Sequence, residues 1–264
     1  MTDGQLNTEV SGSVLHITLD RPERRNSLTH TMIDELVAVL TAAATDDRLR
    51  AVCITGGGAD FCSGADWVAT NADGARPRPP NLVRRIPHTA NRVVELITTL
   101  HLPVVCRVRG WAAGLGCNIA LAADFTIADE DATFWEPFID RGFTPDSGST
   151  WLLPRLVGVA RARRMLLLGE KVGGSQAAGW GMIHDAVPAA VLDDAIDELL
   201  GRLAAGPTVA FGLAKQSLQQ AQTSTLNQSL NAELTQLELA CRTSDFKEGL
   251  AAFRERRNPD FQGR

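Results

Sequence analysis

Two glycine-rich segments are the places where this sequence has residues suited to chemistry. The first reads "CITGGGADFCSGADW", with Gly64 directly before Ala65, and the second reads "VRGWAAGLGCN", with Gly114 directly before Leu115. A sharp turn of this kind leaves backbone N–H groups unpaired at the start of the next element. Such N–H groups, with the positive end of a helix dipole behind them, suit an anion or an oxygen that gains negative charge during a reaction. The two turns therefore predict an oxyanion site.

A nucleotide phosphate loop is the main competing interpretation of these glycines, and the spacing argues against it. The pattern GxGxxG would require glycine where the chain has Phe61, and again where it has Ile119. No GxxxxGK[ST] pattern occurs anywhere in the chain. A second alternative stays open at this point: the glycines could simply permit tight turns and close helix packing.

The elements around these turns alternate between strands and helices. A period-2 pattern predicts a strand over 14–19. Thr29 is a suitable cap for an amphipathic helix with Met32, Leu36, Val39 and Leu40 on one face. Similar patterns predict further strands at 50–56, 102–110 and 124–130, a helix that follows Pro87 and extends to residue 100, and a helix at 115–123. This alternation predicts an α/β fold with crossover connections. Residues 70–81 are rich in Pro, Asp and Arg and predict a loop.

From about residue 189 onward the pattern is helical throughout, with four successive helices. A terminal helical cluster on an α/β body commonly packs against a partner subunit, so we expect an oligomer. The length of 264 residues fits one large domain or a domain with an appendage.

Composition excludes several classes of protein. The formal net charge is −5 with the basic residues scattered, which argues against a nucleic-acid partner. The apolar runs are too short for a bilayer span, and the N-terminal residues do not resemble a signal peptide, so we expect no membrane partner. Five scattered cysteines and the absence of a CxxC pattern predict reduced thiols in a cytoplasmic protein.

A third segment, "FWEPFIDRGFTPDSGSTWLLPRLVGVARARRMLLLGEKVGGSQAAGWGMIHDAV" over 134–187, joins the two turns in a family resemblance. Together they resemble the enoyl-CoA hydratase/isomerase (crotonase) superfamily over nearly the whole chain. The resemblance implies a spiral of β-β-α units with a C-terminal helical region that builds trimers, usually stacked as hexamers. We accordingly expect a spiral core over 1–200 and an oligomerisation region over 201–264. It also implies an acyl-CoA thioester as substrate, with coenzyme A entering as part of that substrate and no covalently bound cofactor.

Residue by residue, the resemblance places the two oxyanion N–H donors at Ala65 and Leu115. Many family members have glycine at the second position, but the backbone N–H that matters is present in leucine as well. The turn residues Ser63, Gly64 and Gly114 then border the substrate.

Other positions match those that hold the two ends of the substrate in the family. Asp66 and the pair Arg24 and Arg25 fall where members hold the adenine ring and phosphates of coenzyme A. An arginine pair in a loop can equally be a solvated face. The apolar side chains that could shape the acyl pocket are Trp67, Trp135 and Phe138.

The reaction depends on which acid–base groups the chain retains. Hydratases of this superfamily use two glutamates, at positions that read Asn118 and Phe138 here, and neither side chain exchanges protons near neutral pH. Asp146 matches the catalytic aspartate of dienoyl-CoA isomerases and chlorobenzoyl-CoA dehalogenases. The run "GFTPDSGSTWLLPRLVG" also resembles 1,2-epoxyphenylacetyl-CoA isomerases. We therefore expect an isomerase that works through an enolate, with Asp146 as its single acid–base group.

Several interpretations stay open for these polar residues. Asp146 is also a suitable helix N-cap. Asn118 could orient a substrate oxygen or a water, or simply satisfy nearby backbone. Asp140 is a second candidate for substrate contact, or a surface charge.

The remaining candidates for chemistry are weaker. Cys62 and Cys117 are expected to be packing residues rather than nucleophiles, and the histidines show no metal-ligand spacing. At the level of the whole protein, a hydratase or lyase of fatty-acid oxidation and a non-catalytic acyl-CoA-binding protein are the alternatives.

Overall fold

The computed structural model describes residues 4–66 and 88–264. The strands are β1 (Gln5–Ser11), β2 (Val14–Asp20), β3 (Ala51–Gly56), β4 (Val104–Val108), β5 (Trp111–Ala113), β6 (Phe125–Asp129), β7 (Thr133–Trp135), β8 (Val172–Gly173) and β9 (Asp185–Val187). The α-helices are α1 (His30–Ala43), α4 (Ala90–Thr99), α5 (Leu115–Ala122), α6 (Ser149–Leu168), α7 (Gly174–Gly179), α8 (Leu192–Ala204), α9 (Thr208–Ala221), α10 (Leu226–Cys241) and α11 (Ser244–Glu255). Short 3₁₀ turns are η1 (Pro22–Arg24), η3 (Ile139–Arg141) and η4 (Ala189–Val191).

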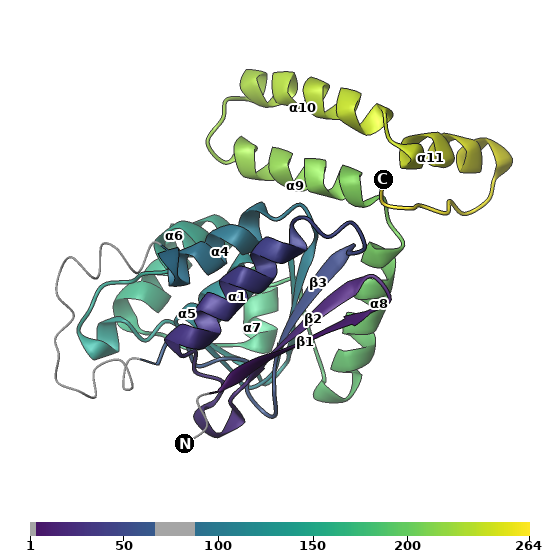
Figure 1. Ribbon diagram of the computed structural model, residues 1–264. Coiled ribbons are helices and arrows are strands. Elements are labelled where there is room, and N and C mark those ends of the chain that lie inside the picture. The colour runs from purple at the N-terminus through teal and green to yellow at the C-terminus, as the bar shows by residue number, and fades with distance from the viewer. Residues whose placement is uncertain (1–3, 67–87) are drawn as a thin grey trace.

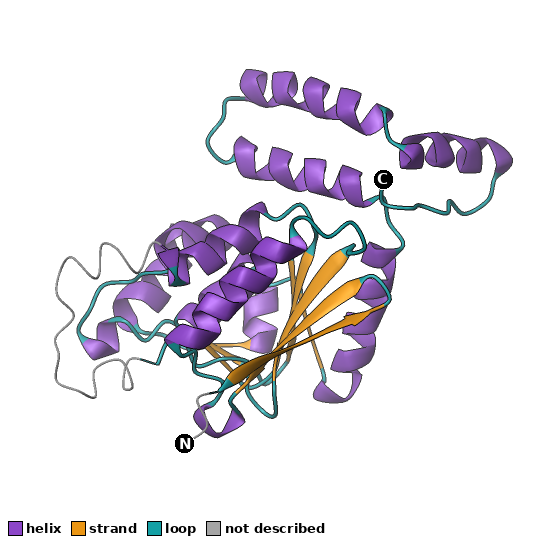
Figure 2. Cartoon of the chain, viewed as in Figure 1, coloured by secondary structure: helices purple, strands orange, loops and turns teal. Residues whose placement is uncertain are grey.

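A twisted six-stranded sheet forms the centre of the molecule, in the order β1-β2-β3-β4-β6-β9 (Figure 2). The hairpin of β1 and β2 is antiparallel, and every later pairing in this sheet is parallel. Parallel neighbours require a crossover between them, and the helices supply it. The predicted α/β class with crossover connections is thus confirmed.

Helices cover both faces of this sheet because strand residues point alternately to opposite sides. On β2, Leu15, Ile17 and Leu19 pack into the larger core with α1, α4 and α5. On the other face, Val14 belongs to a smaller cluster with α8, whose helical members are Leu192, Ile196, Leu200 and Leu203. Figure 1 shows α8 on that side of the sheet.

A second, smaller sheet links the two glycine-rich turns. Its order is β5-β7-β8, with β5 parallel to β7 and β7 antiparallel to β8. Isolated bridges pair Cys62 with Ala112 and Leu28 with Ala65, so the first turn lies directly against β5. This small sheet therefore brings together two segments that are far apart in the chain.

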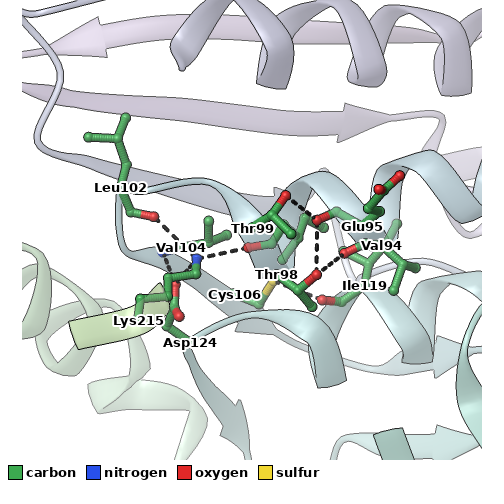
Figure 3. Close-up of polar contacts among 11 residues, drawn as sticks. Val94, Glu95, Thr98, Thr99, Leu102, Val104, Cys106, Ile119, Asp124 and Lys215 are labelled. Atoms are coloured by element: carbon green, nitrogen blue, oxygen red, sulfur yellow. Dashed lines mark hydrogen bonds and ion pairs between the residues drawn. The ribbon is translucent and has the colours of Figure 1, made fainter. Parts of the chain in front are cut away.

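The helices α9, α10 and α11 stand away from the sheet as an arm (Figure 1). Lys215 of α9 anchors the arm's first helix: its Nζ donates to the Asp124 carboxylate at 2.6 Å and to the carbonyl oxygens of Ile97 and Leu102 at 2.8 and 3.3 Å. Asp124 also accepts the Val104 amide at 2.7 Å (Figure 3). The expected division between residues 200 and 201 falls inside α8, which packs on the sheet as far as Leu203.

Most of the predicted elements are present. The helix α1 begins where predicted, with the Thr29 hydroxyl accepting the Met32 amide at 3.2 Å. The sequence analysis gave no strand at β1, β5, β7, β8 or β9. All of these except β1 have three residues or fewer, which is too short for a period-2 pattern to be recognised. Of the helices within the described ranges, none is both long enough and apolar enough to cross a membrane.

Candidate active site

A pocket opens between the two glycine-rich turns, η3 and the loop before α6. Its wall includes Gly64 and Ala65 of the first turn and Gly114 and Leu115 of the second. The other residues that line it are Leu28, His30, Ile33, Ser63, Asp66, Thr89, Ala90, Pro137, Phe138, Arg141, Phe143, Asp146 and Ser147. Many of these side chains are apolar, and the pocket contains Asp146, the acidic residue on which the predicted chemistry depends.

The two turns touch at positions where only glycine fits. A Cβ on Gly64, whose φ is +93°, would lie 2.7 Å from the Ala113 carbonyl oxygen and 3.4 Å from the Leu115 nitrogen. A Cβ on Gly116 would lie 2.3 Å from the Cys62 carbonyl oxygen. Both contacts are with backbone, which cannot move aside as a flexible side chain can. The glycines therefore serve the close approach of the two turns, which supports the packing interpretation and is compatible with the oxyanion one.

The amides of Ala65 and Leu115 are placed at the pocket and lack acceptors. Their neighbours are used internally: Asp66 N–H donates to the Leu28 carbonyl and Gly114 N–H to the Trp135 carbonyl, each at 2.9 Å. Within the described residues, neither the Ala65 nor the Leu115 amide donates a hydrogen bond to a protein acceptor. Leu115 is the first residue of α5, so the positive end of that helix lies behind its N–H.

Asp146 lies in the loop just before α6 and lines the pocket. The Ser147 hydroxyl donates to its Oδ1 at 2.8 Å. Burial raises the pKa of Asp146 above the ordinary value of 3.8, and the Ser147 hydrogen bond partly opposes this by favouring the charged form. The alternative interpretation of Asp146 as a helix cap is wrong, because Gly148 occupies the N-cap position of α6 and no side chain caps it.

Asn118 and Phe138 occupy different positions relative to this pocket. Phe138 lines it and packs edge-on against Phe143, with ring centroids 5.6 Å apart. Asn118 is fully buried and does not line the pocket; its Nδ2 donates to the Asp146 backbone carbonyl at 3.5 Å. This contact favours the interpretation that Asn118 is a buried polar residue that holds the Asp146 loop. It argues against the interpretation that Asn118 contacts the substrate.

The residues expected to hold coenzyme A gather beside the first turn. Ser63 N–H donates to the Arg25 carbonyl at 2.9 Å, and its hydroxyl donates to the Arg24 carbonyl at 3.2 Å. Asp66 lines the pocket, and its carboxylate forms a buried ion pair with Arg21 at 2.6 Å. The exposed side chains of Arg24 and Arg25 do not line the pocket; the Arg25 guanidinium lies over the Trp111 ring.

Two further predicted residues do not join the site in this structure. Asp140 is exposed on η3 and absent from the pocket wall, with its carboxylate next to Gly169 at the end of α6. The structure therefore favours its interpretation as a surface charge. Trp135 donates from its indole nitrogen to the Gly169 carbonyl at 3.0 Å and is likewise absent from the pocket wall. Trp67 and the loop 70–81 lie outside the described residues.

Sequence reasoning missed Glu136 completely. This side chain is fully buried, and neither carboxyl oxygen has a hydrogen-bond partner within the described residues. The available signal was the segment "FWEPF", where an acidic residue stands among four apolar ones. Arg141, which also lines the pocket, was missed for lack of any pattern around it.

The cysteines behave as packing residues, as predicted for Cys62 and Cys117. Both are fully buried, and burial raises the pKa of the Cys62 thiol to about 12 and that of Cys117 well above its ordinary value of 9.0. Neutral thiols of this kind are poor nucleophiles. In the part of the chain that the structure describes, no three His, Cys, Asp or Glu side chains come together as a metal site.

Comparison with known proteins identifies the family. Residues 9–264 match the family model described as enoyl-CoA hydratase/isomerase. The chain belongs to this family. The structure also superposes on the crystal structure of an enoyl-CoA hydratase from Polaromonas sp. JS666 with a TM-score of 0.90 at 30% identity, covering 98% of this chain and 100% of the other. The expected crotonase-like fold with C-terminal helices is thereby confirmed.

Relatives within the enoyl-CoA hydratase/isomerase family carry out more than one reaction. The chain is 39% identical over 257 residues to the 1,2-epoxyphenylacetyl-CoA isomerase of Escherichia coli K12, covering 97% of this chain and 98% of that protein. It is 34% identical over 251 residues to the 2,3-dehydroadipyl-CoA hydratase of the same organism, covering 95% and 96%. Both are named for reactions of CoA thioesters, one as an isomerase and one as a hydratase.

Proposed function

We propose that this enzyme is an acyl-CoA isomerase that works through an enolate, with Asp146 as its acid–base group. The observation that carries the proposal is the combination of two backbone amides without internal acceptors and one carboxyl on the wall of the same pocket. The amides of Ala65 and Leu115 would bind the thioester carbonyl oxygen. The apolar walls around Phe138 and Leu28 would hold the acyl group, and Asp66, Arg24 and Arg25 would hold coenzyme A outside.

The proposed reaction needs one proton to leave the acyl group and return at another carbon. The Asp146 carboxylate takes a proton from a carbon next to the thioester carbonyl, or next to a double bond conjugated with it, and the C–H electron pair moves into a new double bond. Negative charge then collects on the carbonyl oxygen, where two preorganised N–H donors stabilise it. Protonated Asp146 returns the proton elsewhere along the conjugated system, which shifts the double bond. The substrate and product therefore have the same atoms and the same number of electrons.

Isomerisation is favoured over hydration by what the pocket wall contains. Hydration requires one group that activates water and a second that supplies a proton. Among the described residues of the pocket wall, only Asp66 and Asp146 have carboxyl groups, and Asp66 is held in an ion pair with Arg21. Phe138 presents a hydrocarbon ring where a hydratase would place an acid. The relative named 1,2-epoxyphenylacetyl-CoA isomerase supports the same direction.

Substitution of Asp146 tests the acid–base role. Asp146→Asn should lower kcat by about 10²–10⁴-fold, the range for loss of a general acid–base group, while leaving the Kd for an acyl-CoA ester nearly unchanged. The variant is assayed with several unsaturated acyl-CoA substrates, following double-bond position and water uptake separately. Unchanged turnover removes Asp146 from the mechanism. Formation of 3-hydroxyacyl-CoA by the parent enzyme supports a hydratase instead. Tight binding without any exchange of α-protons with solvent supports a non-catalytic role.

The oxyanion role can be tested by removing a single N–H group. Leu115 is the first residue of α5, a position that accepts proline without breaking a helix. Leu115→Pro removes the N–H, and kcat should fall by about 10²–10³-fold, as for loss of one oxyanion donor. Leu115→Ala keeps the N–H and is the matched control for the lost side chain. Equal activities in two folded variants would contradict the oxyanion assignment.

A further inference from the structure

The carboxyl of Glu136 has no role in the proposed mechanism. Its side chain has no exposed surface, and both Oε atoms lack hydrogen-bond partners within the described residues. No lysine, arginine or histidine of those residues forms an ion pair with it. Burying an ionised carboxylate without a partner is far more costly than burying the neutral acid. The Glu136 side chain is therefore held in its protonated form.

Glu136 follows β7 directly and stands immediately behind the site. Its predecessor Trp135 accepts the Gly114 amide through its carbonyl, and its successor Pro137 forms part of the pocket wall. Glu136 itself is absent from that wall, so it does not contact substrate. On α5, the Cys117 thiol lies close to the Glu136 carboxyl.

The helix α5 also connects Glu136 to Asp146. Cys117 faces Glu136, and the next residue, Asn118, donates to the Asp146 carbonyl. Burial has the largest effect in raising the pKa of Glu136, the nearby Cys117 thiol partly opposes it, and the charge of Asp146 raises the pKa further. Two like charges in a buried setting oppose each other strongly. This opposition favours ionisation of only one of the two groups, and Asp146 has the better access to solvent.

We propose that Glu136, which is buried without a hydrogen-bond partner one residue from the pocket wall, keeps its proton while Asp146 is ionised. The pair then carries one negative charge, and ionisation of Glu136 sets the upper pH limit of catalysis. Glu136 is in this sense a positioning residue, because it acts through Asp146 and the charge of the site. This inference rests on the proposed role of Asp146 and goes beyond it.

The charge of the site changes with pH, and the activity should change with it. At low pH both carboxyls are protonated, and Asp146 cannot take a proton from the substrate. At intermediate pH Asp146 is ionised and Glu136 is neutral, so Glu136 adds no charge that would oppose the one developing on the thioester oxygen. At high pH Glu136 also ionises, and its charge opposes the enolate. Activity therefore has an acid limb from Asp146 and an alkaline limb from Glu136.

Other titratable groups also lie around the pair. Cys117 of α5 faces Glu136, but burial raises its thiol pKa well above 9.0. His30 of α1, Asp66 of the first turn and Arg141 of η3 line the same pocket as Asp146. Asp66 is paired with Arg21, and an arginine keeps its charge throughout the range of interest. Substitution of Glu136 therefore separates its contribution from theirs.

The test compares pH profiles of Glu136→Gln, Asp146→Asn and the parent enzyme. The amide introduced by Glu136→Gln does not ionise, so this variant should keep kcat at pH 7 within about threefold, keep the acid limb and lose the alkaline limb of kcat/KM. The exposed residue Glu95 supplies a matched control, since Glu95→Gln should leave both limbs in place. A Glu136→Gln profile that falls equally at all pH values, with both limbs intact, would assign Glu136 a structural role only and overturn the proposal.

A second measurement does not depend on turnover. Infrared difference spectra should contain the carbonyl band of a protonated carboxylic acid at about pH 7, and that band should vanish in Glu136→Gln. In Asp146→Asn the band should titrate at a lower pH than in the parent enzyme, because the neighbouring charge is gone. An unshifted titration would refute the coupling even if Asp146 is catalytic. Full activity of Asp146→Asn with a shifted band would instead refute the proposed function and leave the pair intact.

Discussion

At the scale of single residues, the environment of Asp146 decides what this site can do. Burial makes its carboxylate a stronger base than an aspartate in water, and the Ser147 hydroxyl limits that effect by donating to Oδ1 at 2.8 Å. Ser147 adopts a left-handed backbone with φ of +50°, which is unusual for a residue other than glycine. Strained backbone of this kind persists where surrounding structure holds it, and it frequently marks functional sites.

The pH dependence of activity should report on this hydrogen bond. The proposed mechanism requires ionised Asp146, so kcat/KM should fall as the pH drops through a pKa that is raised above 3.8. Ser147→Gly removes the hydroxyl at a position whose positive φ glycine adopts easily. Loss of a donor to the charged form raises the pKa of Asp146 further, so the acid limb should move to higher pH.

Ser149→Ala is the control for this pH profile, since the Ser149 hydroxyl donates to the Asp146 backbone carbonyl and not to its carboxylate. An acid limb that stays in place, or moves to lower pH, in Ser147→Gly would contradict the assigned role of the hydrogen bond.

At the scale of elements, the site depends on how closely α5 approaches the first glycine-rich turn. The Cys62 carbonyl accepts the Ala113 amide at 2.9 Å, and the backbone of Cys62 lies directly against Gly116 on α5. This contact fixes the distance between Ala65 on one turn and Leu115 on the other. A displacement of about 1 Å between reacting groups can lower a rate about 10²-fold.

Gly116→Ala adds only one methyl group, but it should lower activity strongly. The Cβ in Gly116→Ala would lie 2.3 Å from the Cys62 carbonyl oxygen and 2.7 Å from the Cys62 Cβ, so the two turns must separate. We expect kcat/KM to fall by about 10²-fold and the free energy of unfolding to fall by about 1–3 kcal/mol.

Gly201→Ala in α8 is the matched control, because nothing lies within 4 Å of the added methyl group. In a helix this change should stabilise the protein by about 0.5–1 kcal/mol and leave kcat/KM unchanged. Denaturant titration and steady-state kinetics measure both variants. Wild-type kinetics in Gly116→Ala would show that the approach of the two turns does not position the site.

The link between the arm and the core is also an element-scale property. Lys215 and Asp124 form an ion pair with side chains 10% and 22% exposed, and burial lowers the pKa of the lysine and raises that of the aspartate (Figure 3). Lys215→Met leaves Asp124 buried without its cation, and the free energy of unfolding should fall by about 3–5 kcal/mol.

Two further variants make the Lys215 measurement interpretable. Arg92→Ala, which breaks an exposed pair with Glu95, should leave the free energy of unfolding almost unchanged. Adding Asp124→Asn to Lys215→Met should recover much of the loss, because the unpaired charge is then removed. A loss in Lys215→Met no larger than in Arg92→Ala would show that the pair does not anchor the arm.

At the scale of the whole molecule, the arm carries a row of exposed leucines. On α10, Leu226, Leu230, Leu234 and Leu237 are 76%, 50%, 67% and 59% exposed, and their spacing places them on one face of the helix. Contiguous apolar surface of this kind commonly marks a protein–protein interface. It supports the proposal, made from the family resemblance, of a homotrimer or a hexamer of two trimers.

Sedimentation velocity can test this proposal. The parent enzyme should sediment as a trimer or hexamer, and Leu234→Glu should sediment as a smaller species because it places a charge within the apolar face. Thr235→Glu puts the same charge on a different face of α10 and should keep the assembly of the parent enzyme. A monomeric parent enzyme would refute the proposed assembly and leave the active-site assignment untouched.

The sequence by itself determined α1, α4, α5, the four C-terminal helices, four strands of the central sheet, the Thr29 cap and the two turns, because these depend on hydrogen bonds and periodicities within a few residues. It did not give α6 or α7. The motifs also gave the family, since they span nearly the whole chain. Three results required the tertiary structure: that Asp146 lines the pocket while Gly148 caps α6, that Asn118 holds a loop, and that Glu136 is buried behind the site. Each of these depends on which distant segments become neighbours, and a local pattern carries no information about how much solvent a side chain will lose to them.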